Sequence, residues 1–544
     1  MKLIHGLSFD NIRGDIFGGL TAAVVALPLA LAFGVASGAG PMAGLYGAII
    51  LGFFASVFGG TPSQISGPTG PMTVVMAVIV ARYIDQPAVA FTIVAMGGLF
   101  QILFGALRLG RYINLVPFPV VSGFMTGIGC IIIALQLAPF LGQSHPGASV
   151  VASLMALPGD IVNINGDAAS VAVITLLIVY LTPKAIGRVL PSPLIALVVG
   201  TIAVALTLPG APVLGDIPMG FPDIKMPVIG GALLADMVSS ALILALLGSI
   251  DSLLTSLVAD GITRSQHESD RELIGQGIGN TLAGLFGAIP GAGATMRTVV
   301  NVSAGGRTPI SGAVHAIVLL SVVMGLGPLA AKIPHAVLAG ILIKVGIDII
   351  DWGYLKRIGR APRAGVIIML MVLGLTVFVD LIVAVGVGIV AASLLFVKRM
   401  TDLQLQNVRS GADGLPYDQH ELDLLKRHDG EIMVYHISGP MSFGAAKGLT
   451  RQIAVGAHFK VLVLDLTDVT FIDTSASLAI EDIMVTATGM GVEVIIIGIG
   501  VRIKSTLDRL GVTKVIPANH CFDTRVHALE YAASLLETKN TADR

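Results

Sequence analysis

The chain begins with long apolar runs in which charged residues are almost absent. Between Asp15 and Arg82 there is no Asp, Glu, Lys or Arg. A helix needs about 20 apolar residues to cross a bilayer, so this stretch accommodates two spans and a third, interrupted one. Over the whole chain the apolar runs predict fourteen spans, near residues 16–36, 42–58, 67–82, 88–107, 113–141, 168–182, 191–208, 236–259, 272–288, 294–304, 308–331, 335–347, 365–380 and 381–397.

The basic residues give these spans a direction. If both termini are cytoplasmic, the predicted inner segments hold fourteen Lys and Arg, whereas the outer loops hold only Arg82, Lys225 and Lys332. Cytoplasmic loops of membrane proteins are enriched in Lys and Arg. The pattern therefore predicts a multi-pass protein of a bacterial inner (plasma) membrane, with cytoplasmic N- and C-termini.

The last quarter of the chain has a different composition. Residues 1–397 carry 34 charged side chains, about 9%, whereas residues 398–544 carry 33, about 22%, which is near the soluble average. The change predicts a transmembrane transport domain (1–397), a polar linker (398–430) and a soluble domain (431–540). In the soluble part, alternating strand-like and helix-like runs predict a small α/β domain; the strand-like runs are 432–437, 461–466 and 492–499, and the helix-like ones are 444–456, 475–489, 501–510 and 523–536.

The overall composition excludes several classes of function. Of the 544 residues 54% are hydrophobic and 12% charged, and the net charge is -1. This balance gives no reason to expect a nucleic-acid partner. Cys130 and Cys521 are far apart, and no Ser/His/Asp grouping, phosphate-binding loop or metal-ligand spacing is present. We therefore expect no enzyme and no protein-bound cofactor.

Two short segments place Pro, Gly and hydroxyl residues in the middle of predicted spans. Residues 64–73 read QISGPTGPMT and residues 288–298 read AIPGAGATMRT. Non-helical backbone at membrane depth has to line a buried or wet cavity. These are spans three and ten, the same position in two halves of seven, which predicts an inverted repeat. The helix N-termini that follow would meet near the midplane and attract an anion; simple packing kinks are the alternative.

One carboxylate lies in the middle of a predicted span. Asp251 and Thr255 are four residues apart, hence on one helix face. A carboxylate with a hydroxyl and nearby carbonyls is an all-oxygen set that suits a hard cation such as Na⁺. Proton transfer, pairing with an arginine, or a structural hydrogen bond between helices would also explain Asp251.

One arginine follows the second Gly-rich break. Arg297 lies three residues into the helix that begins there. A fixed cation at a helix N-terminus would add to the attraction for an anion, and the planar guanidinium suits oxyanions. Extension toward the inner face, or neutralisation of Asp251, are the alternatives.

Several motifs together resemble one family. The stretches 18–34 (GGLTAAVVALPLALAFG), 250–260 (IDSLLTSLVAD), 271–280 (RELIGQGIGN) and 297–301 (RTVVN) are similar to the SulP (solute carrier 26) anion transporters, and the likeness covers nearly the whole chain. The chain resembles in particular the BicA-type sodium-dependent bicarbonate transporters, through residues 66–76, 135–143 and 344–352.

The resemblance implies a fourteen-span fold, built as a seven-plus-seven inverted repeat with a core and a gate domain, that dimerises and moves its core like an elevator. It implies a small inorganic anion as substrate, with Na⁺ as the co-transported ion. It also implies a bicarbonate site at Thr69, with Gly70 beside it, and at the backbone around Ala294 and Thr295. The implied sodium ligands are Asp251, Thr255, Gly293, Ala294 and Thr295.

Two positions depart from the BicA-type pattern, which has an acidic residue in place of Gly67 and a glycine in place of Arg297. Many other family members, of sulfate, dicarboxylate and halide type, have an arginine at the second position. If Arg297 took over the charge that sodium supplies elsewhere, transport would be sodium-independent or would favour a divalent anion. Sulfate or dicarboxylate transport, proton-coupled or uncoupled, and an anion channel are therefore the alternatives to sodium–bicarbonate symport.

The tail resembles a STAS domain. Its loop 471–478 (FIDTSASL) is similar to the phosphoacceptor loop of bacterial anti-sigma-factor antagonists, with Ser475 at the acceptor position. Helix capping by Asp473 explains the same loop equally well. Phosphorylation of Ser475 is thus one hypothesis, and a dimer contact or a role in trafficking is the alternative for the domain.

Overall fold

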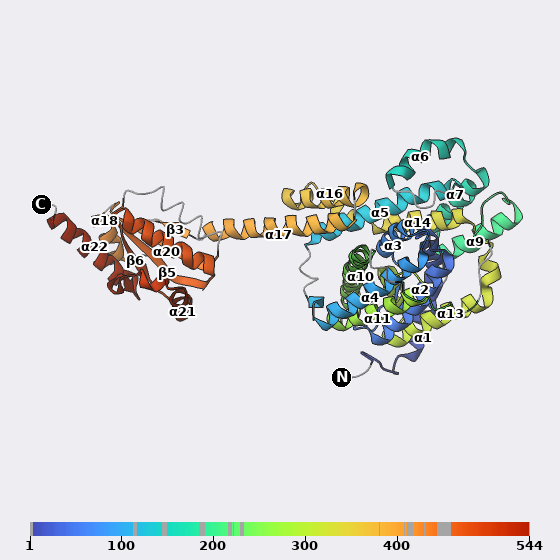
Figure 1. Ribbon diagram of the computed structural model, residues 1–544, viewed down its shortest axis with the longest axis horizontal. Helices are drawn as coiled ribbons and strands as arrows, with labels where there is room; N and C mark the ends of the chain where they lie inside the picture. Colours follow the sequence, from blue (N-terminus) through green and yellow to red (C-terminus); the bar gives the residue numbers. More distant parts are fainter. Residues whose placement is uncertain are drawn as a thin grey trace. The chain divides into compact units, whose positions relative to one another are not determined.

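The structure is a computed structural model that divides into two compact units, residues 1–390 and 391–544, each described by itself (Figure 1). The description covers a set of ranges that together make up most of the chain. These are residues 4–111, 117–143, 150–183, 186, 191–215, 220, 222–228, 233–379, 381–406, 408–410, 417–428, 430–442 and 459–542.

Helices make up almost all of the described first unit, because its apolar runs are long and its backbone has to be paired internally. Each of the fourteen predicted spans contains one of them. In chain order they are α1 (Ile12–Ala36), α2 (Pro41–Phe58), α3 (Gly70–Arg82), α4 (Pro87–Ala106), α5 (Phe118–Phe140), α6 (Val150–Val162), α7 (Gly166–Leu181), α9 (Ser192–Leu206), α10 (Leu234–Thr263), α11 (Ser269–Leu285), α12 (Thr295–Ser303), α13 (Pro309–Ala330), α14 (His335–Ile349), α15 (Trp352–Leu355), α16 (Arg363–Phe378) and α17 (Leu381–Gln406).

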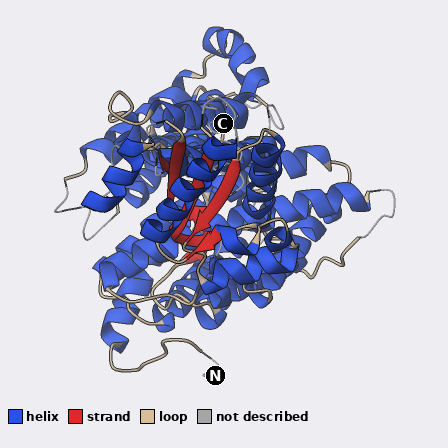
Figure 2. Ribbon diagram, turned by 90° about the vertical axis from the view of Figure 1, so that its left-hand side faces the viewer, coloured by secondary structure: helices blue, strands red, loops and turns tan. Residues whose placement is uncertain are grey.

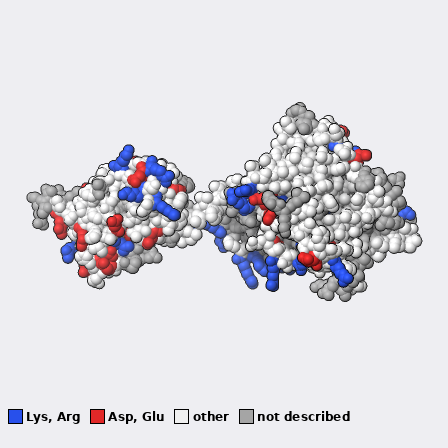
Figure 3. All heavy atoms as spheres, turned by 90° about the horizontal axis from the view of Figure 1, so that it is seen from below, with Lys and Arg blue, Asp and Glu red and all other residues white. Residues whose placement is uncertain are grey.

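Length and composition identify membrane spans among these helices. Within the described residues, α1, α2, α4, α5 and α10 are each long and apolar enough to cross a bilayer, and the pair α6 and α7, bent by 115°, could form a sixth span. Helix α6, which has 13 residues and includes Asp160, is not among the spans that the apolar runs predict. Figure 3 shows broad areas of the first unit without Lys, Arg, Asp or Glu. The unit is therefore a membrane domain.

Glycines let several of these helices pack backbone against backbone. A Cβ at Gly44 on α2 would overlap the carbonyl oxygen of Ala30 on α1. A Cβ at Gly98 on α4 would likewise overlap the backbone of Thr281 on α11. Small residues at such contacts are the usual means by which membrane helices approach closely.

Two very short strands interrupt the helical unit. Strand β1 (Ser66–Gly67) pairs antiparallel with β2 (Ala292–Gly293), with Ser66 opposite Gly293 and Gly67 opposite Ala292. Helix α3 begins three residues after β1, and α12 begins two residues after β2. The two Gly-rich breaks, more than 200 residues apart in the sequence, therefore lie side by side.

The second unit is an α/β domain with a five-stranded sheet in the order β3-β4-β5-β6-β7. Strand β3 is antiparallel to β4, and the remaining neighbours are parallel. Helices α20 and α21 pack on one face of the sheet and α18 and α22 on the other. Figure 2 shows the strands of the sheet in red. The elements are β3 (Val408–Ser410), α18 (Gln419–Arg427), β4 (Ile432–Met441), β5 (Val461–Ile472), α20 (Thr474–Gly489), β6 (Glu493–Ile497), α21 (Val501–Leu510), η2 (Val512–Lys514), η3 (Ala518–His520), β7 (Cys521–Phe522) and α22 (Arg525–Ala542).

The segment predicted as a linker, 398–430, is more structured than expected. It holds the end of α17, the edge strand β3 and helix α18, which packs on the sheet beside α22. Polar composition concealed these elements, because a short edge strand and an amphipathic surface helix need few apolar residues. The helix predicted over 444–456 lies outside the described residues.

The close contact between α1 and α2 generates a first prediction. Gly44→Ala forces a methyl group against the carbonyl of Ala30, so the purified protein should lose about 1–3 kcal/mol of stability and unfold at a lower temperature. Gly374→Ala on α16 is the matched control, because no atom lies within 4 Å of its Cβ position. Thermal unfolding in detergent measures both variants, and equal midpoints would contradict the packing argument.

Candidate ion-binding site

The β1–β2 pair directs two helix N-termini to one place. Thr69 is the N-cap of α3 and Ala294 is the N-cap of α12. The amide of Ala294 donates to the carbonyl of Ile65 at 2.8 Å, which extends the pairing by one residue. The first N–H groups of a helix have no partner within the helix and carry partial positive charge. The predicted convergence of the two breaks is thus what the paired strands produce.

Asp251 lies beside the start of α3. Its carboxylate oxygen Oδ2 accepts a hydrogen bond of 2.7 Å from the hydroxyl of Thr69. The residue is 8% exposed, on the long helix α10. The structure therefore brings together a predicted anion-site residue and a predicted sodium ligand.

One turn further along α10, a second set of oxygens faces β2. The hydroxyl of Thr255 donates to the carbonyl of Gly293 at 2.9 Å and lies 2.7 Å from the hydroxyl of Thr295. The amide of Gly293 donates to the hydroxyl of Ser252 at 3.1 Å. Hydroxyl and carbonyl oxygens of α10, β2 and α12 are thereby held within a few ångströms of each other.

The charge of Asp251 has no cationic partner in the described part of the chain. Its one hydrogen bond comes from the neutral hydroxyl of Thr69. Taking an unpaired carboxylate out of water costs several kcal/mol, so such a group needs either a proton or a bound cation. The oxygens around it are of the kind that a hard cation binds.

The side chain of Arg297 reaches the backbone near β1 and does not pair with Asp251. It is 1% exposed, and its Nη2 donates to the carbonyl of Pro68 at 3.0 Å rather than to Asp251. Neutralisation of Asp251 by a direct ion pair is therefore wrong for this structure. The guanidinium occupies the space beside Gly67, where a Cβ would overlap Nη1.

Two N–H-bearing atoms of this guanidinium, Nε and Nη1, have no hydrogen-bond partner among the described residues. A buried cation whose N–H groups have no acceptors is energetically costly unless an anion or a water molecule accepts from them. The side chain belongs to the first turn of α12. It thus adds positive charge to the N-terminus at which the two breaks converge.

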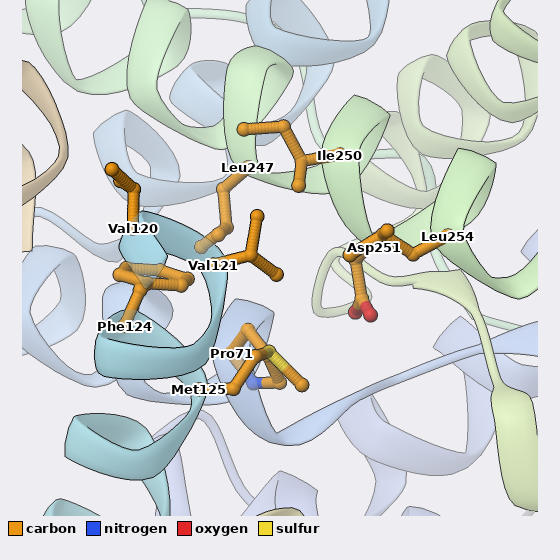
Figure 4. Close-up of a pocket in the computed structure, with 9 residues that line it drawn as sticks. All are labelled: Pro71, Val120, Val121, Phe124, Met125, Leu247, Ile250, Asp251 and Leu254. Carbon is orange, nitrogen blue, oxygen red and sulfur yellow. The ribbon is translucent and has the colours of Figure 1, made fainter. Parts of the chain in front are cut away.

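An apolar pocket opens next to Asp251. Figure 4 shows the carboxylate as the one charged group among the nine labelled lining residues. Helix α3 contributes one of them, α5 four and α10 four. They are Pro71, Val120, Val121, Phe124, Met125, Leu247, Ile250, Asp251 and Leu254. An ion that reached Asp251 from this side would pass between α5 and the pair formed by α3 and α10.

Sequence reasoning missed the buried polar residues that support the β1–β2 pair. Ser252 binds the amide of Gly293, and Gln64 contacts Glu272 at 2.7 Å. Ser252 lies in the stretch 250–260 and Glu272 in the stretch 271–280, but neither residue type indicates a role at its position by itself. The sequence offers no distinct signal for Glu272, because it lies in the first turn of α11, where an acidic residue is common for its interaction with the helix dipole.

In the second unit, Ser475 is exposed at the second residue of α20. The side chain of Asp473 caps this helix by accepting from the amide of Ala476 at 2.7 Å. The capping interpretation therefore accounts for Asp473, and the hydroxyl of Ser475 remains accessible. The role of Ser475 as a phosphoacceptor stays a prediction.

A charged cluster lies on the sheet of the same unit. Asp465 is fully buried and lies 3.0 Å from Nδ1 of His436 and 3.1 Å from Nη2 of Arg525. Burial alone would raise the pKa of Asp465, but hydrogen bonds from Thr467 and His436 more than offset it and hold the pKa below its ordinary value. The cluster joins β4, β5 and α22 and serves the stability of this domain.

Comparison with known proteins covers both units. A family model described as the sulfate permease family matches residues 12–372, and a STAS domain model matches residues 423–528. The bicarbonate transporter BicA of Picosynechococcus sp. is 46% identical to this chain over 98% of this chain and 96% of that protein.

Two solved structures resemble this chain. The transmembrane domain of a cyanobacterium bicarbonate transporter BicA is 52% identical, with a TM-score of 0.67, and covers 71% of this chain and 100% of that one. The structure of SLC26A9 is 19% identical, with a TM-score of 0.83, and covers 98% of this chain and 92% of that one. This second likeness shows a shared fold for nearly the whole chain.

The close fit of Arg297 beside Gly67 generates a second prediction. Gly67→Ala should push the guanidinium away from the carbonyl of Pro68 and destabilise the purified protein by about 1–3 kcal/mol. Arg297→Gly empties the space, so the double variant should be no less stable than Arg297→Gly alone. Thermal unfolding of the four proteins measures the coupling. Additive effects of the two substitutions would show that the residues do not share this space.

Proposed function

The chain belongs to the sulfate permease family of anion transporters, as its motifs predicted, and from this premise we propose that it is a sodium-coupled bicarbonate symporter. The observation that carries the proposal is Asp251, a buried carboxylate with no cationic partner among the described residues. It lies beside the converging N-termini of α3 and α12. Bicarbonate is the substrate in the name of a relative that is 46% identical along almost the whole chain.

The cation would bind at the oxygen atoms near Asp251. Sodium is a hard ion and prefers carboxylate, hydroxyl and carbonyl oxygens. The carboxylate of Asp251, the hydroxyl of Thr255 and the carbonyl of Gly293 supply these three types. Ala294 and Thr295, at the start of α12, complete the proposed set.

The anion would bind at the two helix N-termini. Thr69 and Gly70 form the start of α3, while Ala294 and Thr295 form the start of α12. Free N–H groups at such ends bind oxyanions, and the charge of Arg297 adds to this attraction. With sodium bound at Asp251, the anion meets positive charge on both sides, so the two ions would favour each other's binding.

We propose that the ions reach Asp251 through the apolar pocket. It lies between α5 and the pair formed by α3 and α10. We propose fourteen spans in a seven-plus-seven inverted repeat, cytoplasmic termini, a homodimer and an elevator-like movement of the core past the gate. The transport domain would end near residue 397, and the STAS domain (431–540) would carry Ser475 as a regulatory site.

A second candidate function rests on Arg297. Two of its nitrogen atoms lack partners among the described residues, so a divalent oxyanion such as sulfate could use them. A fixed cation beside the site would also reduce the need for sodium. Sulfate transport, proton-coupled or uncoupled, is therefore the alternative.

Uptake into proteoliposomes tests the proposal. Labelled bicarbonate and labelled sulfate are compared, each with and without an inward sodium gradient, at fixed pH. Saturable bicarbonate uptake that sodium stimulates is the expected result. Sulfate uptake independent of sodium would overturn the proposal in favour of the alternative, and single-channel currents in place of saturable uptake would identify a channel.

The role of Asp251 generates a third prediction. Asp251→Asn removes the negative charge that the proposed sodium ion neutralises, so sodium stimulation of bicarbonate uptake should be lost. Asp236→Asn is the matched control on the same helix, because Asp236 is exposed and pairs with Arg82 at 2.7 Å. An Asp251→Asn protein with the sodium dependence of the wild type would remove this residue from the sodium site.

The position of Arg297 generates a fourth prediction. Arg297→Gly removes the fixed cation, so the affinity for a divalent anion should fall more than the affinity for bicarbonate. Competition by unlabelled sulfate against labelled bicarbonate measures the ratio, with Arg297→Lys as the control that keeps a charge. Equal loss for both anions would mean that the guanidinium does not discriminate between them by charge.

A further inference from the structure

We infer that Glu272 is a positioning residue for the ion site. It holds the paired strands β1 and β2, and with them the carbonyl of Gly293, without touching an ion. The inference deepens the proposed function, on which it rests, because Gly293 is one of the proposed sodium ligands. Glu272 lies on α11 and is 1% exposed. It forms no ion pair within the described residues, so its charge is held by dipoles.

The carboxylate of Glu272 is fully used as an acceptor. Its Oε2 accepts from the amides of Gly60 and Thr61, both at 2.9 Å. Its Oε1 accepts from the side-chain amides of Gln64 at 2.7 Å and Gln276 at 2.8 Å. Four donors thus converge on one side chain, and three of them belong to the segment that leads into β1.

The first connection to the ion site runs through Gln64. The side chain of Gln64 packs directly on β2, because a Cβ at Gly293 would overlap its amide group. The hydroxyl of Ser256 donates to Oε1 of Gln64 at 3.1 Å and so ties it to α10. Gln64 is therefore wedged between Glu272 and Gly293, whose carbonyl accepts from Thr255.

The second connection runs through Gln276. Its amide group donates to Glu272 and also lies 2.6 Å from the hydroxyl of Ser66 on β1. Ser66 is the residue opposite Gly293 in the strand pair. Glu272 therefore holds β2 through Gln64 and β1 through Gln276.

Only a carboxylate accepts from all four donors as they are oriented here. A glutamine at position 272 would place an NH₂ group against two of them, and to accept from it the side-chain amides of Gln64 and Gln276 would have to turn, which changes their contacts with Ser256 and Ser66. A buried donor facing donors costs the desolvation energy of each unsatisfied group. The loop from Gly60 to Gln64 would shift, and the carbonyl of Gly293 would lose its support.

The test measures ion affinity separately from turnover. In proteoliposomes, Glu272→Gln should raise the KM for sodium about tenfold, as for other residues that orient an ion ligand. At saturating sodium the KM for bicarbonate should rise less than the KM for sodium, and the maximal rate should stay within about twofold of the wild type, because bound sodium restores the arrangement of the residues that the two ions share. A general loss of folded protein would lower the maximal rate without this split.

Asp15→Asn is the matched control. Asp15 is also a fully buried carboxylate, and it accepts from the amides of Arg307 at 2.7 Å and Thr308 at 2.9 Å, and from the hydroxyl of Thr308 at 2.8 Å. These contacts hold the turn between α12 and α13, at the opposite end of α12 from the ion site. Its loss should leave the KM for sodium unchanged.

Hydrogen exchange of the purified protein gives a readout that does not depend on sodium coupling. Glu272→Gln should speed amide exchange in residues 60–70 and 291–297, whereas Asp15→Asn should not. If the wild type transports without sodium, the proposed coupling fails and exchange alone decides on Glu272. Unchanged exchange, an unchanged KM for sodium, or an equal effect of Asp15→Asn would overturn the inference. If Glu272→Gln does not fold, Glu272→Asp, which keeps both oxygens on a shorter side chain, should give a smaller shift of the same kind.

Discussion

Backbone that leaves the helical conformation inside a membrane has to find its hydrogen bonds within the protein. In this chain the two breaks satisfy part of that requirement with each other, through the pairing of β1 with β2, and part with neighbouring side chains such as Ser252. The rest of the site depends on this pairing. Because the strands are fixed side by side, the helices that follow them begin at the same place, and α10 can present Asp251 and Thr255 to both starts.

The structure separates the two charges of the site rather than joining them. Asp251 accepts from the hydroxyl of Thr69 and faces an apolar pocket, whereas Arg297 donates to the carbonyl of Pro68, the residue that follows strand β1. A direct ion pair would have cancelled both charges. Kept apart, the carboxylate needs a cation and the guanidinium favours an anion, which is the arrangement that a symporter of two opposite ions requires.

The sequence predicted the helices well and the contacts within the site less well. Apolar runs located most helical segments of the first unit, and strand–helix alternation located three of the five strands of the second, because both patterns follow directly from burial. Strands β3 and β7, of three and two residues, are too short to leave such a pattern. Helix α6 was missed since it is short and carries Asp160. The β1–β2 pairing leaves no periodic signal in two residues per strand. The course of Arg297 depends on the empty side-chain position of Gly67, a neighbour 230 residues away that no local pattern reveals.

Sodium binding by the purified protein tests the central claim most directly. The thermal midpoint is measured as sodium replaces potassium at constant ionic strength, in the absence of any transported anion. A ligand that binds only the folded state stabilises it by RT ln(1 + L/Kd), where L is the concentration of the free ligand, so the stabilisation grows with that concentration. The account predicts a midpoint that rises with sodium and not with potassium. Identical midpoints in the two salts would contradict it, since the buried carboxylate would then be neutralised by something other than sodium.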